Sequence, residues 1–223
     1  MKVVIVFKNL KQLIMEQNWM ESLEPLLQQY GKRKHPLEYK NRYQLLVMII
    51  LSAQVSDRNI NKLAPVFFEV YPSMSSLAKA TPEDLHKIIH TVMNFGKKSD
   101  ALVKMAQQIG DDDKIPVTMA ELTKLPAIGR KSANIVICES GCPEEGIVVD
   151  LLVVRVAPRI GIAEGDNPEK IEKQLMKLVP QDRWNEIGMA LSFLGREICR
   201  PTDPDCRICV MNQVCRYYNE KLK

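Results

Sequence analysis

A run of closely spaced cysteines near the C-terminal end is the feature that most constrains how this chain can fold. Four of its six cysteines fall within the stretch CRPTDPDCRICVMNQVC, with the spacing C-x6-C-x2-C-x5-C. They are Cys199, Cys206, Cys209 and Cys215. Four thiolates can close a single metal site, and the chain between them must then form a loop around it.

The spacing of these cysteines bears on which metal they would hold. A structural zinc site usually offers two close cysteine pairs, whereas this run has one, and iron–sulfur clusters accept more irregular spacing. The pattern therefore favours an iron–sulfur cluster over zinc, and it leaves disulfides or free thiols as a third interpretation. Cys138 and Cys142 stand apart from the run, and we expect them to be thiols without a ligand role.

The compartment decides how clustered cysteines are interpreted. The first ten residues, MKVVIVFKNL, have an apolar run shorter than the roughly 7–15 residues of a signal-peptide core. The longest apolar run, residues 45–51, is far shorter than the roughly 20 residues that cross a bilayer. We therefore expect a cytoplasmic protein without a membrane segment, in a reducing compartment where stable disulfides are rare.

Periodicity and capping signals predict an all-α chain with a full hydrophobic core. Thr81 before Pro82 and Asn167 before Pro168 each place a capping side chain ahead of a proline at the first helical position. Apolar residues then recur at helical spacing in two C-terminal segments, at Ile171, Leu175 and Leu178 and at Trp184, Ile187, Leu191, Leu194 and Ile198. Residues 45–51 are apolar on every side, and we expect a buried helix there.

The stretch TMAELTKLPAIGRKSANIVI, residues 118–137, predicts two helices joined by a tight hairpin. Thr118 and Glu121 have the spacing of a capping box, so a short helix is expected to run to about Leu125, where Pro126 ends it. Residues 127–129 then form the hairpin, and a second helix covers residues 130–137, with Ile128 and Val136 pointing inward. The first turn of that helix has unpaired N–H groups that suit a phosphate, although a simple helical connection has the same pattern.

Two polar residues stand out in apolar surroundings. Asp150 is the carboxylate of the apolar run GIVVDLLVVRV, so it needs a partner or a role as a helix cap. Gln54 follows the buried helix in the stretch ILSAQVSD, where it projects from a rigid element. A cap at Asp150 and an ordinary surface position for Gln54 are the alternatives to functional roles.

Four stretches together resemble the endonuclease III family of the helix–hairpin–helix DNA glycosylase superfamily. They are ILSAQVSD (50–57), LPAIGRKSAN (125–134), VVD (148–150) and the cysteine run, and they occur in the family's order and spacing. The resemblance extends from about residue 20 to about residue 218. It implies an enzyme of base excision repair that removes damaged, oxidised pyrimidines from duplex DNA and cuts the abasic strand by β-elimination.

The resemblance also implies roles for individual residues. The four cysteines of the run match the ligands of a 4Fe–4S cluster. Lys131 matches the nucleophile that forms an imine with the sugar, and Asp150 matches the catalytic carboxylate. The implied DNA-binding residues are Gln54, Asn94, Phe95, Ala127, Gly129 and Arg130, with Arg58, Lys97 and Lys98 as further candidates for phosphate contacts. Gln54 would fill the space that an extruded base leaves, and Asn94 or Phe95 would wedge into the opposite strand.

The implied architecture has two helical domains on either side of a DNA-binding groove. One covers residues 34–145, with the helix–hairpin–helix at about 118–138. The other joins residues 1–33 to residues 146–223 and carries the cluster. We expect Lys131 and Asp150 on opposite walls of the groove, in a monomer that binds double-stranded DNA containing damaged bases or abasic sites and is associated with the nucleoid.

The chain departs from the family pattern beside the expected catalytic groups. Ala127 replaces the first glycine of the hairpin, and Leu151 and Leu152 stand where many members have threonine and histidine. An adenine-mismatch glycosylase is one alternative, but that subfamily lacks a lysine at the position of Lys131. A non-catalytic iron–sulfur protein that binds DNA or senses redox state is another, and the presence of Lys131 and Asp150 argues against it.

Overall fold

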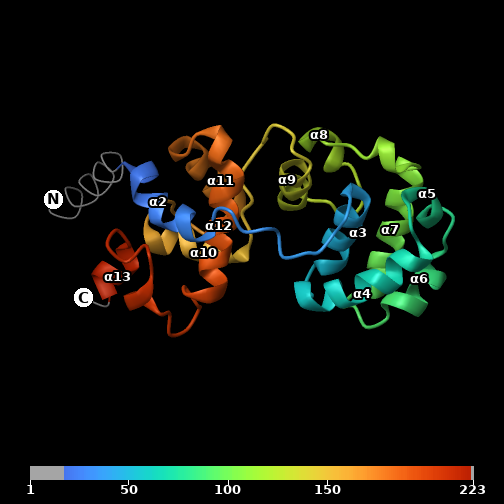
Figure 1. Ribbon diagram of the computed structural model, residues 1–223, viewed down its shortest axis with the longest axis horizontal. Helices are drawn as coiled ribbons and strands as arrows, with labels where there is room; N and C mark the ends of the chain where they lie inside the picture. Colours follow the sequence, from blue (N-terminus) through green and yellow to red (C-terminus); the bar gives the residue numbers. More distant parts are fainter. Residues whose placement is uncertain (1–17, 222–223) are drawn as a thin grey trace. The chain divides into compact units, whose positions relative to one another are not determined.

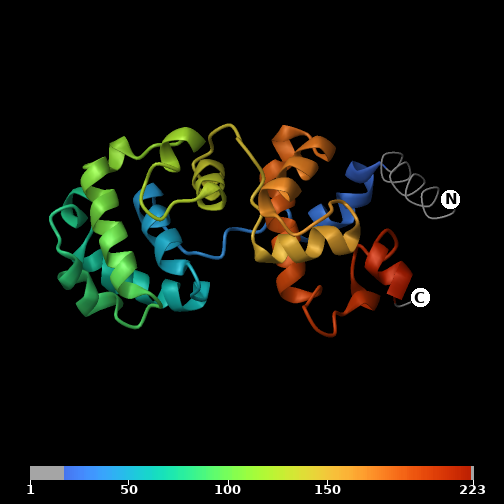
Figure 2. The same cartoon turned by 180° about the vertical axis from the view of Figure 1, so that it is seen from behind.

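The structure is a computed structural model that describes residues 18–221. Within this range every regular element is a helix, so the all-α prediction is confirmed (Figures 1 and 2). The chain divides into two compact units, Lys34–Glu145 and a discontinuous unit that joins the residues up to Arg33 to those from Gly146 onward. The segment MKVVIVFKNL, expected not to be a signal peptide, lies outside the described residues.

The unit Lys34–Glu145 is a bundle built around one apolar helix. Its elements are α3 (Arg42–Ser52), α4 (Asp57–Val70), α5 (Met74–Leu77), α6 (Pro82–Ile89), α7 (Phe95–Ile109), η1 (Asp112–Lys114), α8 (Met119–Leu122) and α9 (Arg130–Glu139). Helix α3 packs against α4, α7 and α9. Every side chain of residues 45–51 is buried, which confirms the predicted buried helix and explains why it is apolar on all sides.

The predicted helix starts are present and have the expected chemistry. Thr81 caps α6, Pro82 is its first residue, and Asp84 completes a capping box with Thr81. Asn167 caps α11 (Pro168–Leu178) in the other unit by accepting a hydrogen bond from the N–H of Lys170. These local signals define where the helices begin because they satisfy backbone N–H groups that have no partner within the helix.

The discontinuous unit packs its N-terminal helix and the segment from residue 146 onward into one core. Its elements are α2 (Trp19–Tyr30), α10 (Leu151–Ile160), α11, η2 (Gln181–Arg183), α12 (Trp184–Glu197), η3 (Cys206–Ile208) and α13 (Arg216–Lys221). Helix α12 packs against both α2 and α10. The predicted apolar stripes supply this core, since Ile171, Leu175, Ile187, Leu191 and Leu194 are all buried. Leu178, Trp184 and Ile198 are partly buried at its edge.

The helix predicted from residue 118 to about 125 is wrong in length and in its cap. Helix α8 spans only Met119–Leu122, followed by turns that lead into the hairpin. The Thr118 hydroxyl donates to the Glu121 carboxylate at 2.8 Å instead of accepting from the backbone. The N–H of Met119 is bound by Glu145, at 3.0 Å, a residue from much later in the chain. The capping box does not form, because the Thr118 hydroxyl and the Glu121 carboxylate bind each other and not the backbone N–H groups of the helix start.

Helix length also bears on membrane contact. Across residues 18–221, no helix combines the length and the apolar character needed to span a bilayer. The most apolar helix, α3, has 11 residues and is covered on all sides by its own unit.

Candidate functional site

The hairpin between α8 and α9 presents a helix N-terminus to solvent. Ile128 is buried and anchors the turn, while Ala127 and Gly129 on either side of it are exposed. Gly129 is the N-cap of α9 and has no side chain with which to bind the first N–H groups of the helix. Those groups and the positive end of the helix dipole form a site that suits a phosphate. The inward positions predicted for Ile128 and Val136 are confirmed.

The two basic residues that open α9 have different surroundings. Arg130 is partly buried, and its guanidinium donates to the carbonyl oxygen of Glu145 at 3.5 Å. Lys131, the second residue of the helix, is exposed. Its amine is therefore accessible from solvent, on a helix that is anchored by the buried residues 133–137.

Ala127 adopts a backbone conformation that disfavours alanine. Its φ of 61° lies in the left-handed region, where a Cβ atom costs about 1–2 kcal/mol. The family glycine that Ala127 replaces would adopt this conformation without that cost. The turn is thus retained despite the substitution, with strain stored next to the expected phosphate site.

We predict that Ala127→Gly stabilises the protein by about 1 kcal/mol, because relief of the strain exceeds the extra chain entropy of glycine. Ala101→Gly is the matched control. Ala101 lies inside helix α7, where the same change should destabilise by about 1 kcal/mol. Urea unfolding of both variants measures the two signs, and destabilisation by Ala127→Gly would contradict the assignment of strain to this turn.

Gln54 and Asn94, predicted separately as DNA-binding residues, are hydrogen-bonded to each other. The side-chain amide of Asn94 donates to Gln54 Oε1 at 3.2 Å. Both residues are exposed, and both have positive φ, 61° for Gln54 and 59° for Asn94. Non-glycine residues in this conformation concentrate at functional sites. The structure therefore joins the two predicted positions into one preformed polar surface.

The buried side chain of Lys98 connects the first turn of α7 to the end of α3. It is 6% exposed, and its ammonium donates to the carbonyl oxygens of Leu51 at 2.8 Å and Ala53 at 2.6 Å, at the end of α3. Burial lowers the pKa of the Lys98 ammonium. The carbonyl ends of a helix favour a cation, which offsets part of that cost. The expectation that Lys98 contacts phosphate is wrong, because its charge is committed to the protein's own backbone.

Phe95 is the first residue of α7 and is 37% exposed. Its ring meets the ring of His86 edge-on, with 5.1 Å between centroids, so it is held at the surface by the packing of α6 against α7. Lys97 and Arg58 are both exposed and stay candidates for phosphate contacts.

Asp150 begins α10 as its N-cap. Its Oδ1 accepts hydrogen bonds from the N–H groups of Leu152 at 2.9 Å and Val153 at 2.8 Å. Its Oδ2 accepts from the hydroxyl of Ser192 at 2.7 Å. The carboxylate is partly buried, so it combines a cap role with a face toward solvent. The next residue, Leu151, leaves 82% of its surface exposed and places an apolar side chain beside this group.

Ser192 is a polar partner that the sequence interpretation missed. It lies in α12, 42 residues away along the chain, and it is 4% exposed. The sequence carries only a weak indication of this role for Ser192. It was a serine on the helix face that also carries Gly188 and Gly195, in a helix otherwise interpreted from its large apolar residues.

The four cysteines of the C-terminal run line one cavity. The rest of its lining is mostly apolar or aromatic, with two polar side chains among it: Ile160, Leu194, Ile198, Tyr217, Tyr218, Arg159 and Asn212. All of these cysteines are free thiols. In residues 18–221 no group of three or more His, Cys, Asp or Glu side chains is arranged to hold a metal ion. The assignment of the four cysteines as ligands therefore stays a prediction.

Charge in this cavity is costly without a cation. Burial raises the pKa of Cys209 to about 11, and burial also raises the pKa values of Cys206 and Cys215, with the neighbouring thiols adding to the effect. Arg159 opposes it from α10, where its guanidinium lies 3.6 Å from Cys199 Sγ. Four thiolates in so apolar a space need metal charge to be stable.

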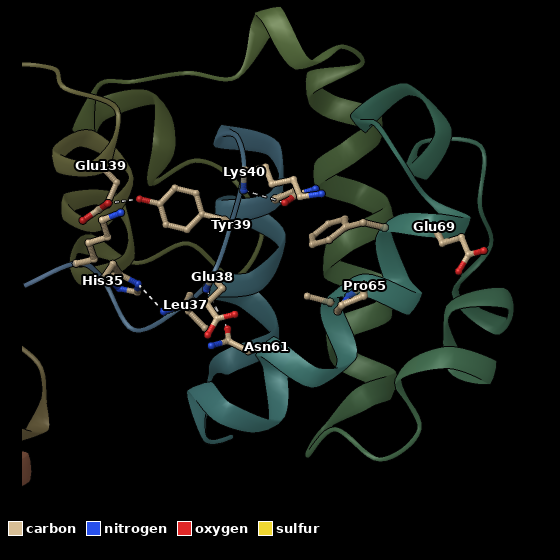
Figure 3. A pocket seen from close by; sticks show the side chains of 13 residues that line it. His35, Leu37, Glu38, Tyr39, Lys40, Asn61, Pro65, Glu69 and Glu139 are labelled. Carbon is tan, nitrogen blue, oxygen red and sulfur yellow. Dashed lines mark hydrogen bonds between the residues drawn. The ribbon is translucent and has the colours of Figure 1, made fainter.

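A wide hollow elsewhere in the unit Lys34–Glu145 has no such convergence of reactive groups. Figure 3 shows its lining, where several of the polar groups are hydrogen-bonded to one another. Asn61 accepts from the N–H of Glu38 at 3.0 Å and donates to the carbonyl of Pro36 at 2.9 Å, while the Tyr39 hydroxyl donates to Glu139. These bonds hold the segment after residue 34 against α4 and α9. The polar residues of this hollow therefore have a structural role.

Comparison with known proteins agrees with these features. Residues 47–181 match the HhH-GPD superfamily base excision DNA repair protein family. The chain is 33% identical over 205 residues to endonuclease III of Thermotoga maritima, covering 90% of this chain and 95% of the relative. It is 35% identical over 192 residues to endonuclease III of Rickettsia felis, covering 85% and 89%.

A solved structure of similar fold is described as "Structure of a Trapped Endonuclease III-DNA Covalent Intermediate: Estranged-Adenine Complex". It has a TM-score of 0.83 and 29% identity, and the match covers 92% of this chain and 97% of that chain. Fold and sequence together define a DNA glycosylase of base excision repair. The chain belongs to the HhH-GPD superfamily of base excision DNA repair proteins.

Proposed function

We propose that this glycosylase is bifunctional, removing oxidised pyrimidines from duplex DNA and then cutting the abasic strand through an imine on Lys131. The observation that carries the proposal is the exposed lysine in the first turn of α9, beside hairpin N–H groups that suit a phosphate. A glycosylase that only hydrolyses the base has no need of an amine there. The solved relative described as a trapped covalent intermediate with DNA supports this choice.

Binding comes first and rests on the unit Lys34–Glu145. The hairpin N–H groups would take one phosphate, and Arg58 and Lys97 would add charge along the strand. The preformed pair of Gln54 and Asn94 would enter the duplex where the damaged nucleotide leaves it, because the bond to be broken is inaccessible in the stack. The pair is held in place by Lys98, so little conformational freedom is lost on binding.

Chemistry then follows in two steps. The neutral amine of Lys131 attacks C1′ of the sugar, the bond from C1′ to the base breaks, and the base leaves with the bonding electrons and takes up a proton. The ionised carboxylate of Asp150 stabilises positive character on the sugar and accepts a proton from the lysine nitrogen. The proposal requires these two side chains, which lie in different units, to face one bound nucleotide.

Strand cleavage uses the imine formed by ring opening of the sugar. Loss of a proton from C2′ allows the bond between C3′ and its oxygen to break, so the 3′ phosphate leaves. Water then hydrolyses the imine and returns Lys131 as a free amine.

Leu151 gives the surface beside Asp150 an apolar character, which favours lesions without a polar group on that side.

A panel of duplexes, each with one lesion, tests the proposal. We expect base release and a nicked strand with oxidised pyrimidines, and little product with an undamaged duplex or with adenine mismatched to guanine. Base release without a nick would contradict the lyase step. Adenine release from the mismatch as the main activity would contradict the substrate class.

We further propose that Cys199, Cys206, Cys209 and Cys215 hold a 4Fe–4S cluster. The donor set fits, since four free thiols line one cavity whose other walls are mostly apolar, and the single guanidinium of Arg159 cannot balance four thiolates. The cluster would supply a rigid crosslink between the four points of the loop. Arg200 and Arg207 lie in that loop. Arg200 forms an ion pair within it, with 3.0 Å between its Nη1 and Asp205 Oδ2.

The purified protein is therefore expected to be brown, with about four iron and four sulfide per chain. Cys206→Ser should lose most of the iron. Cys138→Ser and Cys142→Ser are the matched controls, because these cysteines lie outside the cavity, and both should keep it. Iron and sulfide analysis with metal analysis for zinc decides the matter, and zinc in place of iron would overturn the proposed cofactor.

A further inference from the structure

The structure assigns Ser192 a role as the positioning residue of the Asp150 carboxylate. This inference rests on the proposed function, because it concerns how the proposed catalytic carboxylate is held. Both residues belong to the discontinuous unit, and the hydroxyl of Ser192 lies 2.7 Å from Asp150 Oδ2. An ionised carboxylate only accepts hydrogen bonds, so the serine is the donor.

The two oxygens of Asp150 are bound from different elements. Oδ1 accepts both N–H groups at the start of α10, which is the ordinary bonding of a helix cap. A cap alone holds one oxygen and leaves the plane of the carboxylate to rotate about it. The bond from Ser192 to Oδ2 fixes that plane, and it leaves the remaining lone pair of Oδ2 as the one to meet a sugar.

Helix α12 is shaped to bring Ser192 to this place. Gly188, Ser192 and Gly195 are spaced four and three residues apart, so they share one face of the helix. A Cβ atom at Gly188 would lie 2.8 Å from the carbonyl oxygen of Val148, and one at Gly195 would lie 3.0 Å from Leu152 Cβ. The helix therefore lies directly against the segment that carries Asp150, on both sides of the serine.

A serine inside a helix commonly bonds the carbonyl one turn earlier in its own helix. Ser192 instead directs its hydroxyl to Asp150 from a position that is 4% exposed. Among large apolar neighbours such as Leu191 and Leu194, a buried hydroxyl is retained at the contact with the carboxylate. The presence of a hydroxyl at position 192 is therefore explained by its hydrogen bond to Asp150 and not by the packing of the helix.

The test compares rate and binding in Ser192→Ala. With enzyme in excess over a duplex carrying one oxidised pyrimidine, the rate constant for base removal should fall about tenfold, because a catalytic group has lost its fixed orientation. The Kd for a duplex with an uncleavable abasic analogue should change less than about twofold, since no DNA contact is removed. Ser192→Thr restores the hydroxyl and should recover most of the rate. Ser99→Ala, which removes another buried hydroxyl, is the control and should leave the rate unchanged.

A double-mutant cycle separates positioning from a merely structural role. In the Asp150→Asn background, Ser192→Ala should change the rate by less than about twofold, because the group it orients is gone. An equal loss in both backgrounds, or a wild-type rate in Ser192→Ala, would overturn the inference. A wild-type rate in Asp150→Asn itself would instead overturn the proposed function, so the two failures are distinguishable.

Discussion

Lys131→Gln is expected to abolish the covalent adduct that borohydride traps between the wild-type protein and an abasic duplex. The reason is chemical, because an imine requires a primary amine and glutamine has none. Strand cleavage should fall to the background rate. Binding to an uncleavable abasic analogue should weaken only modestly, since one charge among several phosphate contacts is removed.

Lys124→Gln is the matched control for this loss. Lys124 is also exposed, and it lies seven positions earlier, just before the hairpin. Its substitution removes the same charge and should leave trapping and cleavage in place. An adduct that persists at the wild-type rate in Lys131→Gln would show that another amine does the chemistry.

Asp150→Asn is expected to slow base removal by about a hundredfold or more while the protein stays folded. Asparagine is as good an N-cap as aspartate, so α10 keeps its start, but the negative charge that stabilises the sugar is lost. Single-turnover base release measures the effect, and thermal unfolding verifies the fold.

Asp166→Asn controls for the loss of a negative charge from the same unit. Asp166 is exposed and precedes α11, so its substitution should change neither quantity. A rate for Asp150→Asn within a few fold of the wild type would mean that the carboxylate serves as a helix cap and not as a catalytic group.

The elements that local sequence determines were predicted correctly. Thr81 and Asn167 mark helix starts because a side chain three residues before an unpaired N–H can bind it without any partner from elsewhere in the chain. The apolar run at residues 45–51 predicted a buried helix for a similar reason, since a helix that is apolar on all sides has no face for water.

What the sequence did not predict depends on residues far apart in the chain. Lys98 looked like a phosphate contact, yet its ammonium reaches carbonyls 45 and 47 positions earlier. The first N–H of α8, on Met119, is bound by Glu145 from 26 positions later. Ser192 found Asp150 through the packing of two helices. A polar side chain in a sequence shows what it can bind, and only the fold decides which partner it reaches.

The residues with positive φ were predictable only in part. Ala127 was suspect because the resemblance implied a glycine there, and its φ of 61° agrees with a turn that needs the left-handed conformation. Gln54 and Asn94 gave no such signal, although asparagine tolerates this conformation better than most residues. Their side chains meet across 40 residues in a hydrogen bond, a contact between two distant segments that neither segment indicates by itself.

Mapping the trapped adduct tests the central claim most directly. The wild-type protein, incubated with an abasic duplex and borohydride, is digested with protease and nuclease, and the modified peptide is sequenced by mass spectrometry. A reduced sugar fragment on the side-chain nitrogen of Lys131 is the predicted result. Modification of a different lysine or of the N-terminal amine, or no adduct alongside efficient strand cleavage, would contradict a mechanism built on Lys131.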